Sequence, residues 1–154
     1  MDERIEIANV VGALAVHTDA RRWEDLLTLF APDVRVDYAS LFGDEPKVTP
    51  REQLIEQWRQ FLPGFTHTTH LIGTPAISIR SEQAQCTASV LASHLVKDAG
   101  LAEVNRWIVG GSYEISLTKL DGAWRISSLT LARAWGDGTL DLPRIARERM
   151  GTAS

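Results

Sequence analysis

The pattern of apolar residues changes once along this chain, near residue 66, and this change constrains the fold more than any other feature. Before it, apolar residues recur at helical spacing, whereas after it they alternate with polar residues as strands do. The alternation is clearest from Gln83 to Val96, where every even-numbered residue except His94 is apolar. Helices followed by long strands predict an α+β fold, in one domain over residues 1–154.

Three helices are predicted in the first part of the chain. Two run over residues 3–17 and 21–30, where apolar residues return every three or four positions. The third starts at a capping box formed by Thr49 and Glu52, and it ends near residues 63–64. We expect these helices to cover one face of a sheet.

Strands account for most of the other residues. A short strand reaches Tyr38, and a loop over residues 43–49 follows it. Longer strands are predicted over 68–79 with a bend at Gly73 and Pro75, and over 83–96, 104–120 and 124–135. Asp121-Gly122 predicts a hairpin turn, and residues 141–150 a short C-terminal helix. About six mostly antiparallel strands of this length would curl, leaving a cone with a pocket on the concave face.

Composition excludes several classes of protein. With 16 basic and 20 acidic residues the formal charge is −4, which disfavours nucleic acid as a partner. The single cysteine, Cys86, permits no internal disulfide and no cysteine-rich zinc site. The chain starts without a signal-peptide pattern, and no apolar run is long enough to span a bilayer. We therefore expect a cytoplasmic protein that does not bind membranes.

Four polar residues fall on faces that should point inward. His94 lies among apolar neighbours, as a core histidine bound to a backbone carbonyl or as a cavity residue. Asp19 ends a stripe of small residues on the first helix, where it either caps the next helix or faces the sheet. Tyr38 and His70 share the parity of apolar neighbours, so each is either a core residue or a ligand contact.

Metal binding is not favoured. His67 and His70 are three residues apart on a predicted strand, so their side chains point to opposite faces. The adjacent pair Gly110-Gly111 indicates a bend in a strand rather than a phosphate-binding loop. We expect neither a metal nor an organic cofactor.

The chain resembles the NTF2-like, SnoaL-like superfamily of cone-shaped α+β domains, and within it the scytalone dehydratases. The resemblance covers nearly the whole chain and includes pocket residues as well as the order of the elements. It is carried by Thr18-Asp19 before Trp23, by residues 36–38 and 69–74, and by Asp121-Gly122-Ala123-Trp124 and Trp135-Gly136.

This resemblance implies a cofactor-independent dehydratase that eliminates water from a small, hydrophobic, cyclic hydroxy ketone. Asp19 would orient His70 as the general base, Tyr38 would stabilise the enolate, and His70 or His94 would protonate the leaving group. Further residues are expected to contact the substrate: Trp23, Val90, Trp107, Tyr113 and Leu142. The family's second pocket tyrosine is replaced by Thr18, and its aromatic C-terminal lid by Leu142 and Ala146, so a different substrate is expected.

Two other functions fit the same residues. A SnoaL-like polyketide cyclase or an isomerase of the ketosteroid type would begin with the same proton abstraction, and a binding or assembly module would use the pocket without catalysis. We also expect a homo-oligomer, dimer or trimer, with Trp107, Val109 and Ile115 as a possible interface on their long strand.

Overall fold

In the computed structural model, which describes residues 2–97 and 105–151, seven strands form one mixed sheet. The strands are β1 (Phe30–Asp37), β2 (Lys47–Pro50), β3 (His67–Ile72), β4 (Ala76–Arg80), β5 (Gln83–Val96), β6 (Asn105–Leu120) and β7 (Ala123–Gly138). Their order is β2-β1-β7-β6-β5-β3, and β4 pairs with the other end of β5 on the same edge as β3. Only β1 and β7 are parallel; every other described pair is antiparallel.

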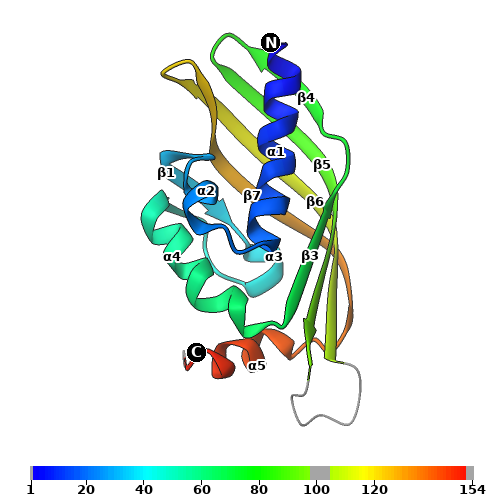
Figure 1. The fold of residues 1–154 in the computed structure, drawn as a ribbon. Helices are drawn as coiled ribbons and strands as arrows, with labels where there is room; N and C mark the ends of the chain where they lie inside the picture. Colours follow the sequence, from blue (N-terminus) through cyan, green and yellow to red (C-terminus); the bar gives the residue numbers. More distant parts are fainter. Residues whose placement is uncertain (1, 98–104, 152–154) are drawn as a thin grey trace.

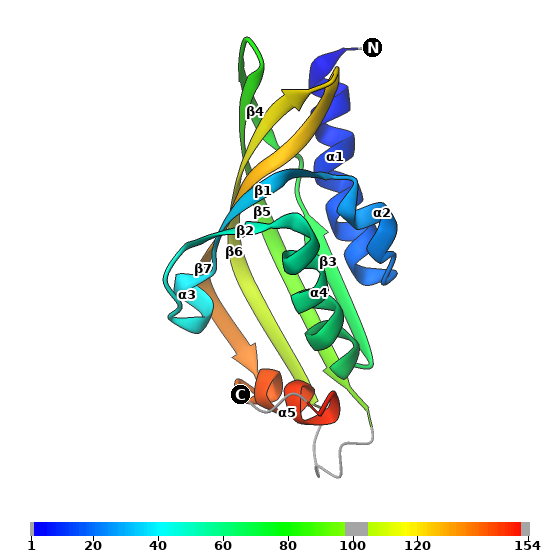
Figure 2. The same ribbon diagram turned by 90° about the vertical axis from the view of Figure 1, so that its left-hand side faces the viewer.

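The helices lie on the concave side of this sheet. Figures 1 and 2 show α1 (Glu3–Asp19), α2 (Trp23–Leu27) and α4 (Arg51–Phe61) on one face, and α5 (Leu142–Arg149) across one end of the long strands. A short helix, α3 (Ala39–Phe42), follows β1, and a 3₁₀ turn, η1 (Leu62–Gly64), follows α4. The buried apolar side chains gather between the sheet and these helices and form the core.

The β strands after residue 66 follow their sequence pattern closely. In β5 all seven even-numbered side chains from Ala84 to Val96 are buried, and the odd-numbered ones are exposed or half-buried. Asp121 and Gly122 both have positive φ, 51° and 79°, as a two-residue hairpin turn requires, which confirms the predicted turn between β6 and β7. Alternation predicts these elements well because one face of each strand packs on the helices.

The first part of the chain differs from the prediction in its helices. Four α-helices, not three, precede β3, because residues 38–43 form the extra turn α3, ended by Gly43 at φ 76°. The helix expected over 21–30 is shorter, and Phe30 instead begins β1. Pro32 lies inside β1 at an irregular stretch of its pairing with β7, so its missing N–H interrupts no regular ladder there.

Two boundary predictions are also corrected. Thr49 does not cap α4; it pairs with Val34 in the β1–β2 ladder, and Pro50 precedes the helix without a side-chain cap. The strand expected over 68–79 is divided into β3 and β4 around Gly73 and Pro75, because both halves pair with β5 but with different register. The predicted start at Val104 lies outside the described residues.

The expected interface on β6 is wrong. Trp107, Val109 and Ile115 are buried beneath the helices of their own chain, between 0 and 5% exposed, and cannot contact another subunit. No helix in the described ranges is both long and apolar enough to cross a membrane.

Candidate active site

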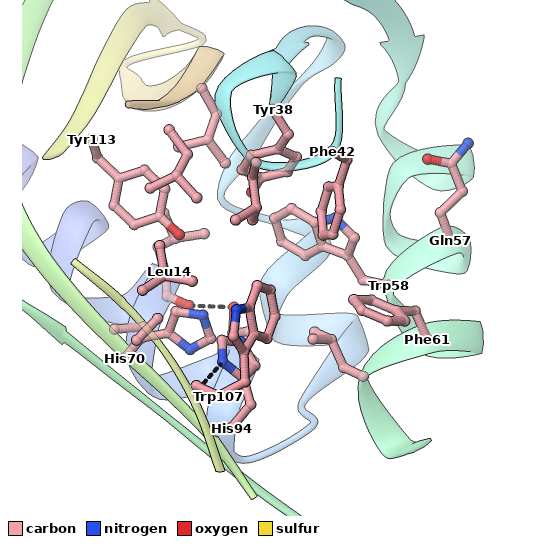
Figure 3. A pocket seen from close by; sticks show the side chains of 18 of the residues that line it. Leu14, Tyr38, Phe42, Gln57, Trp58, Phe61, His70, His94, Trp107 and Tyr113 are labelled. Carbon is pink, nitrogen blue, oxygen red and sulfur yellow. Dashed lines mark hydrogen bonds between the residues drawn. The ribbon is translucent and has the colours of Figure 1, made fainter. Parts of the chain in front are cut away.

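A cavity of about 280 Å³ lies between the concave face of the sheet and the helices. Most of its wall is aromatic or aliphatic, and Figure 3 shows the rings of Phe42, Trp58, Phe61 and Trp107 around it. Its polar lining includes His70, His94 and the two tyrosines Tyr38 and Tyr113. Few polar groups in a mostly apolar pocket are typical of a small-molecule site.

Asp19 and His70 form a hydrogen-bonded pair at the edge of this cavity. Asp19 is the last residue of α1, and its Oδ1 lies 2.7 Å from Nδ1 of His70 in β3. The same carboxylate accepts the backbone N–H of His70 at Oδ2, also at 2.7 Å, and the hydroxyl of Thr68 at Oδ1, at 3.0 Å. A carboxylate accepts, so His70 carries its proton on Nδ1 and leaves Nε2 available to a ligand.

The three hydrogen bonds keep Asp19 ionised. Burial raises the pKa of its carboxyl group, but the bonds from the ring and backbone of His70 and from Thr68 outweigh burial and hold the pKa below its usual value. Asp19 caps no helix, since α2 begins without a side-chain cap. Of the two alternatives for Asp19, the structure therefore favours the one facing the sheet.

His94 lies beside His70 with its ring in the same cavity. The two ring centroids are 5.8 Å apart and the ring planes are inclined at 83°. Figure 3 shows both histidines beside each other at the cavity. Nδ1 of His94 lies 3.1 Å from the carbonyl oxygen of Trp107, which can only accept, so Nδ1 carries the proton. Burial, together with the nearby His70, lowers the pKa of His94 to about 4, so this imidazole is neutral near pH 7.

Two tyrosine hydroxyls meet in the same cavity. Tyr38 comes just after β1 and Tyr113 from the centre of β6, and both side chains line the cavity (Figure 3). Their hydroxyl groups are near enough to influence each other's pKa. Burial raises the pKa of Tyr113 to about 12, and burial together with the Tyr113 hydroxyl raises that of Tyr38 well above its ordinary value. Both phenols therefore remain protonated at neutral pH and can donate hydrogen bonds.

The residues predicted to contact the substrate lie at different places relative to the cavity. Trp107 and Tyr113 line the cavity, but Trp23, Val90 and Leu142 do not. Val90 and Leu142 are buried core residues, and Trp23 packs against the core from α2. Trp23 and Val90 were predicted on inward faces and Leu142 at the position of the family's lid, but periodicity does not tell which inward residues border a cavity and which fill the core.

Other functional candidates were not found from the sequence. Phe42, Trp58, Phe61 and Arg147 line the cavity, from α3, α4 and α5. The apolar spacing of α4 marked Trp58 as inward, and this signal could have placed α4 over the pocket. Nothing in the sequence marked Arg147 or the short helix α3.

Metal ligands do not converge at this site. His67 is exposed, while His70, three residues later, faces the cavity, as strand parity predicts. Within residues 2–97 and 105–151, no group of three or more histidine, cysteine, aspartate or glutamate side chains lies close enough together to hold a metal ion.

The curved sheet, the covering helices and the enclosed polar cluster define a domain of the NTF2-like class. The chain belongs to the SnoaL-like domain family, whose model matches residues 1–130. Among curated sequences, the uncharacterized protein Rv2910c of Mycobacterium tuberculosis is 29% identical over 85 residues. That match covers 54% of this chain and 55% of the relative, so the chain spans about half the length of the curated relatives it matches.

Solved structures share this fold over most of their length. Kfla4162 from Kribbella flavida is 26% identical with a TM-score of 0.87, covering 92% of this chain and 96% of its own. A protein named a "putative scytalone dehydratase" from Novosphingobium aromaticivorans is 25% identical with a TM-score of 0.73, covering 89% and 87%. A hexachlorocyclohexane dehydrochlorinase (LinA) is 14% identical with a TM-score of 0.74, covering 88% and 87%, and shows the fold alone.

Proposed function

We propose that this protein is a cofactor-independent dehydratase that eliminates water from a small cyclic hydroxy ketone. The observation that carries the proposal is the 2.7 Å contact between Asp19 Oδ1 and His70 Nδ1 at the edge of a mostly apolar cavity. An imidazole fixed in one tautomer by a carboxylate is a general base whose second nitrogen is free to accept a proton.

The first step is removal of a proton from the carbon next to the ketone. His70 Nε2 takes this proton, and the imidazolium that forms is stabilised by the ionised Asp19. The electron pair of the C–H bond moves toward the carbonyl, which becomes an enolate. General base catalysis of this kind contributes about 10²–10⁴-fold in rate.

The enolate oxygen requires hydrogen-bond donors. Tyr38 and Tyr113 both line the cavity as neutral phenols, and one hydroxyl of the interacting pair can bind the substrate oxygen while the other supports it. Donors held in place before the reaction stabilise developing charge strongly, because the site is shielded from water.

His70 also returns the proton to the leaving group. The enolate collapses, the β C–O bond breaks, and the departing hydroxide takes the proton from His70 to become water. His94 is the weaker acid–base candidate, since its Nδ1 proton is bound to Trp107 and its pKa of about 4 keeps the ring neutral. Its Nε2 instead accepts the hydrogen bond of the substrate hydroxyl and orients it.

The test is turnover of a panel of cyclic β-hydroxy ketones by purified protein, followed by mass spectrometry. A product lighter by one water establishes dehydration, whereas a product of unchanged mass indicates an isomerase or cyclase that uses the same base. His70→Ala should lower turnover at least about a hundredfold. His67 is exposed on the opposite face of β3, so His67→Ala should leave turnover unchanged and serves as the control. Full activity of His70→Ala would reject the proposal.

Binding without catalysis is the remaining alternative. It predicts that ligands of the cavity bind equally well after loss of Asp19 and that no member of the panel is converted. The homo-oligomer and the cytoplasmic location remain predictions, to be measured by light scattering and by fractionation.

A further inference from the structure

Arg21 lies outside the cavity lining, yet its guanidinium reaches the hydrogen-bond network of Asp19. We propose that Arg21 is a positioning residue that, through the hydroxyl of Thr68, holds Asp19 in place for His70. The inference rests on the proposed function, in which Asp19 orients the catalytic base.

The backbone at Arg21 places this residue at the end of α1, near Asp19. Arg21 has φ 57°, in the left-handed region that favours glycine, and it follows α1 by two residues. A residue with a side chain is held there at a cost of about 1–2 kcal/mol. This conformation belongs to the Schellman motif that ends α1, in which the backbone N–H groups of Arg21 and Arg22 donate to the carbonyl oxygens of Thr18 and His17 at 3.2 and 3.0 Å.

The side chain of Arg21 fixes the direction of the Thr68 hydroxyl. Its Nη1 lies 2.8 Å from Thr68 Oγ1, and because a guanidinium only donates, the hydroxyl oxygen must accept. The hydroxyl hydrogen is then directed to Asp19 Oδ1, 3.0 Å away. This Oδ1 is the same atom that accepts the ring proton of His70, so the four side chains of Arg21, Thr68, Asp19 and His70 form one chain of hydrogen bonds.

Arg21 also joins the elements that must stay together for this contact. It donates to the carbonyl oxygen of Thr18 at 3.0 Å and to that of Leu62 at 2.9 Å. These bonds connect the end of α1 and the turn η1 to β3, which carries Thr68 and His70. Asp19 must span the space between α1 and β3. The hydrogen bonds of Arg21 therefore set the distance over which the Asp19 carboxylate reaches the imidazole ring of His70.

The chain offers a matched set of variants. Arg21→Met removes all donors, and Arg21→Gly also removes the backbone strain, which guards against a variant that fails to fold. Thr68→Val removes the hydroxyl at nearly constant shape, and Thr68→Ser restores it. Arg22→Met, at the exposed neighbouring position, is the control.

Two measurements test the role. We expect kcat to fall about tenfold in Arg21→Met, Arg21→Gly and Thr68→Val, with KM changed less than about twofold, because a hydrogen bond to a charged group is lost. Thr68→Ser should recover most of the rate. Arg21→Met combined with Thr68→Val should be no slower than either single variant, since both break one chain.

Nuclear magnetic resonance of ¹⁵N-histidine-labelled protein gives a readout that needs no substrate. His70, assigned by comparison with His70→Gln, should carry its proton on Nδ1 in the unaltered protein and in Arg22→Met. The Nδ1-protonated fraction should fall in Arg21→Met, Arg21→Gly and Thr68→Val. Unchanged His70 ring signals in these folded variants would overturn the inference, even if no substrate is turned over. Changed ring signals in a protein that turns over no substrate would support the positioning role of Arg21 and would count against the proposed dehydratase function.

Discussion

Replacing Asp19 with asparagine is the most direct perturbation of the candidate site. The side chain keeps its shape but loses the negative charge that faces His70 Nδ1 at 2.7 Å. Both side chains are largely shielded from solvent, with 23% of Asp19 and 12% of His70 exposed. The charge is therefore screened less than it would be at the surface.

The expected loss can be worked out from this distance. Opposite unit charges 2.7 Å apart attract by about 6 kcal/mol at an effective dielectric constant of about 20. If about half of the imidazolium charge has developed in the transition state, Asp19→Asn costs about 3 kcal/mol, or about a hundredfold in rate. An amide NH₂ turned toward His70 would also favour the wrong tautomer and raise the loss toward about 10⁴-fold.

The assay is steady-state turnover of whichever cyclic hydroxy ketone the panel identifies, with circular dichroism to establish folding. Asp33→Asn, at an exposed position of β1, makes the same chemical change away from the cavity and serves as the control. A turnover rate of Asp19→Asn within about threefold of that of the unaltered protein would refute the view that the carboxylate stabilises a charged imidazole.

Three further predictions concern stability and reactivity. The pKa of His94 in the folded protein is about 4, below the ordinary 6.5, so the neutral ring contributes stability that is complete above pH 6.5 and is lost as the pH falls through about 4. Urea unfolding should therefore show that the free energy of unfolding falls by about 3 kcal/mol over this pH window. The His94→Phe variant should not show this loss. In Gly64→Ala the new Cβ would clash with the backbone carbonyl of Ala146 in α5, so the melting temperature should fall. Gly12→Ala, where nothing lies within 4 Å of the new Cβ, should raise the free energy of unfolding by up to about 1 kcal/mol. Cys86 is buried, and burial raises the pKa of its thiol to about 11. The native protein should therefore not react with Ellman's reagent until urea unfolds it. Rapid reaction of the folded protein would contradict the position of Cys86 in the core.

The order of elements and the inward faces were predictable because they depend on local periodicity. Every even-numbered residue of β5 is buried as its alternation predicts, and the Asp121-Gly122 turn lies where its two residues indicate. The helical region was predicted less well. Thr49 had the chemistry of a cap, but pairing with β1 used its backbone, and tertiary contacts prevailed over a local signal of about 1 kcal/mol.

The site itself depended on packing between distant segments. Periodicity predicted that Trp23 and Val90 face inward but did not separate them from Trp107 and Tyr113, because residues that line a cavity and residues that fill the core have the same pattern. A strand pattern likewise did not show that Trp107 would be covered by helices of its own chain instead of by another subunit.

By itself, the sequence determined the fold class, the parity of each strand and the polar residues that face inward, since these follow from a repeat of two or three to four residues. Only the tertiary structure decided that the end of α1 meets β3, so that Asp19 and His70, 51 positions apart, share a hydrogen bond. It also decided that Arg21, in a backbone conformation the sequence did not indicate, turns back to Thr68. Such contacts depend on the curvature of the sheet and the docking of the helices, and these are properties of the whole chain.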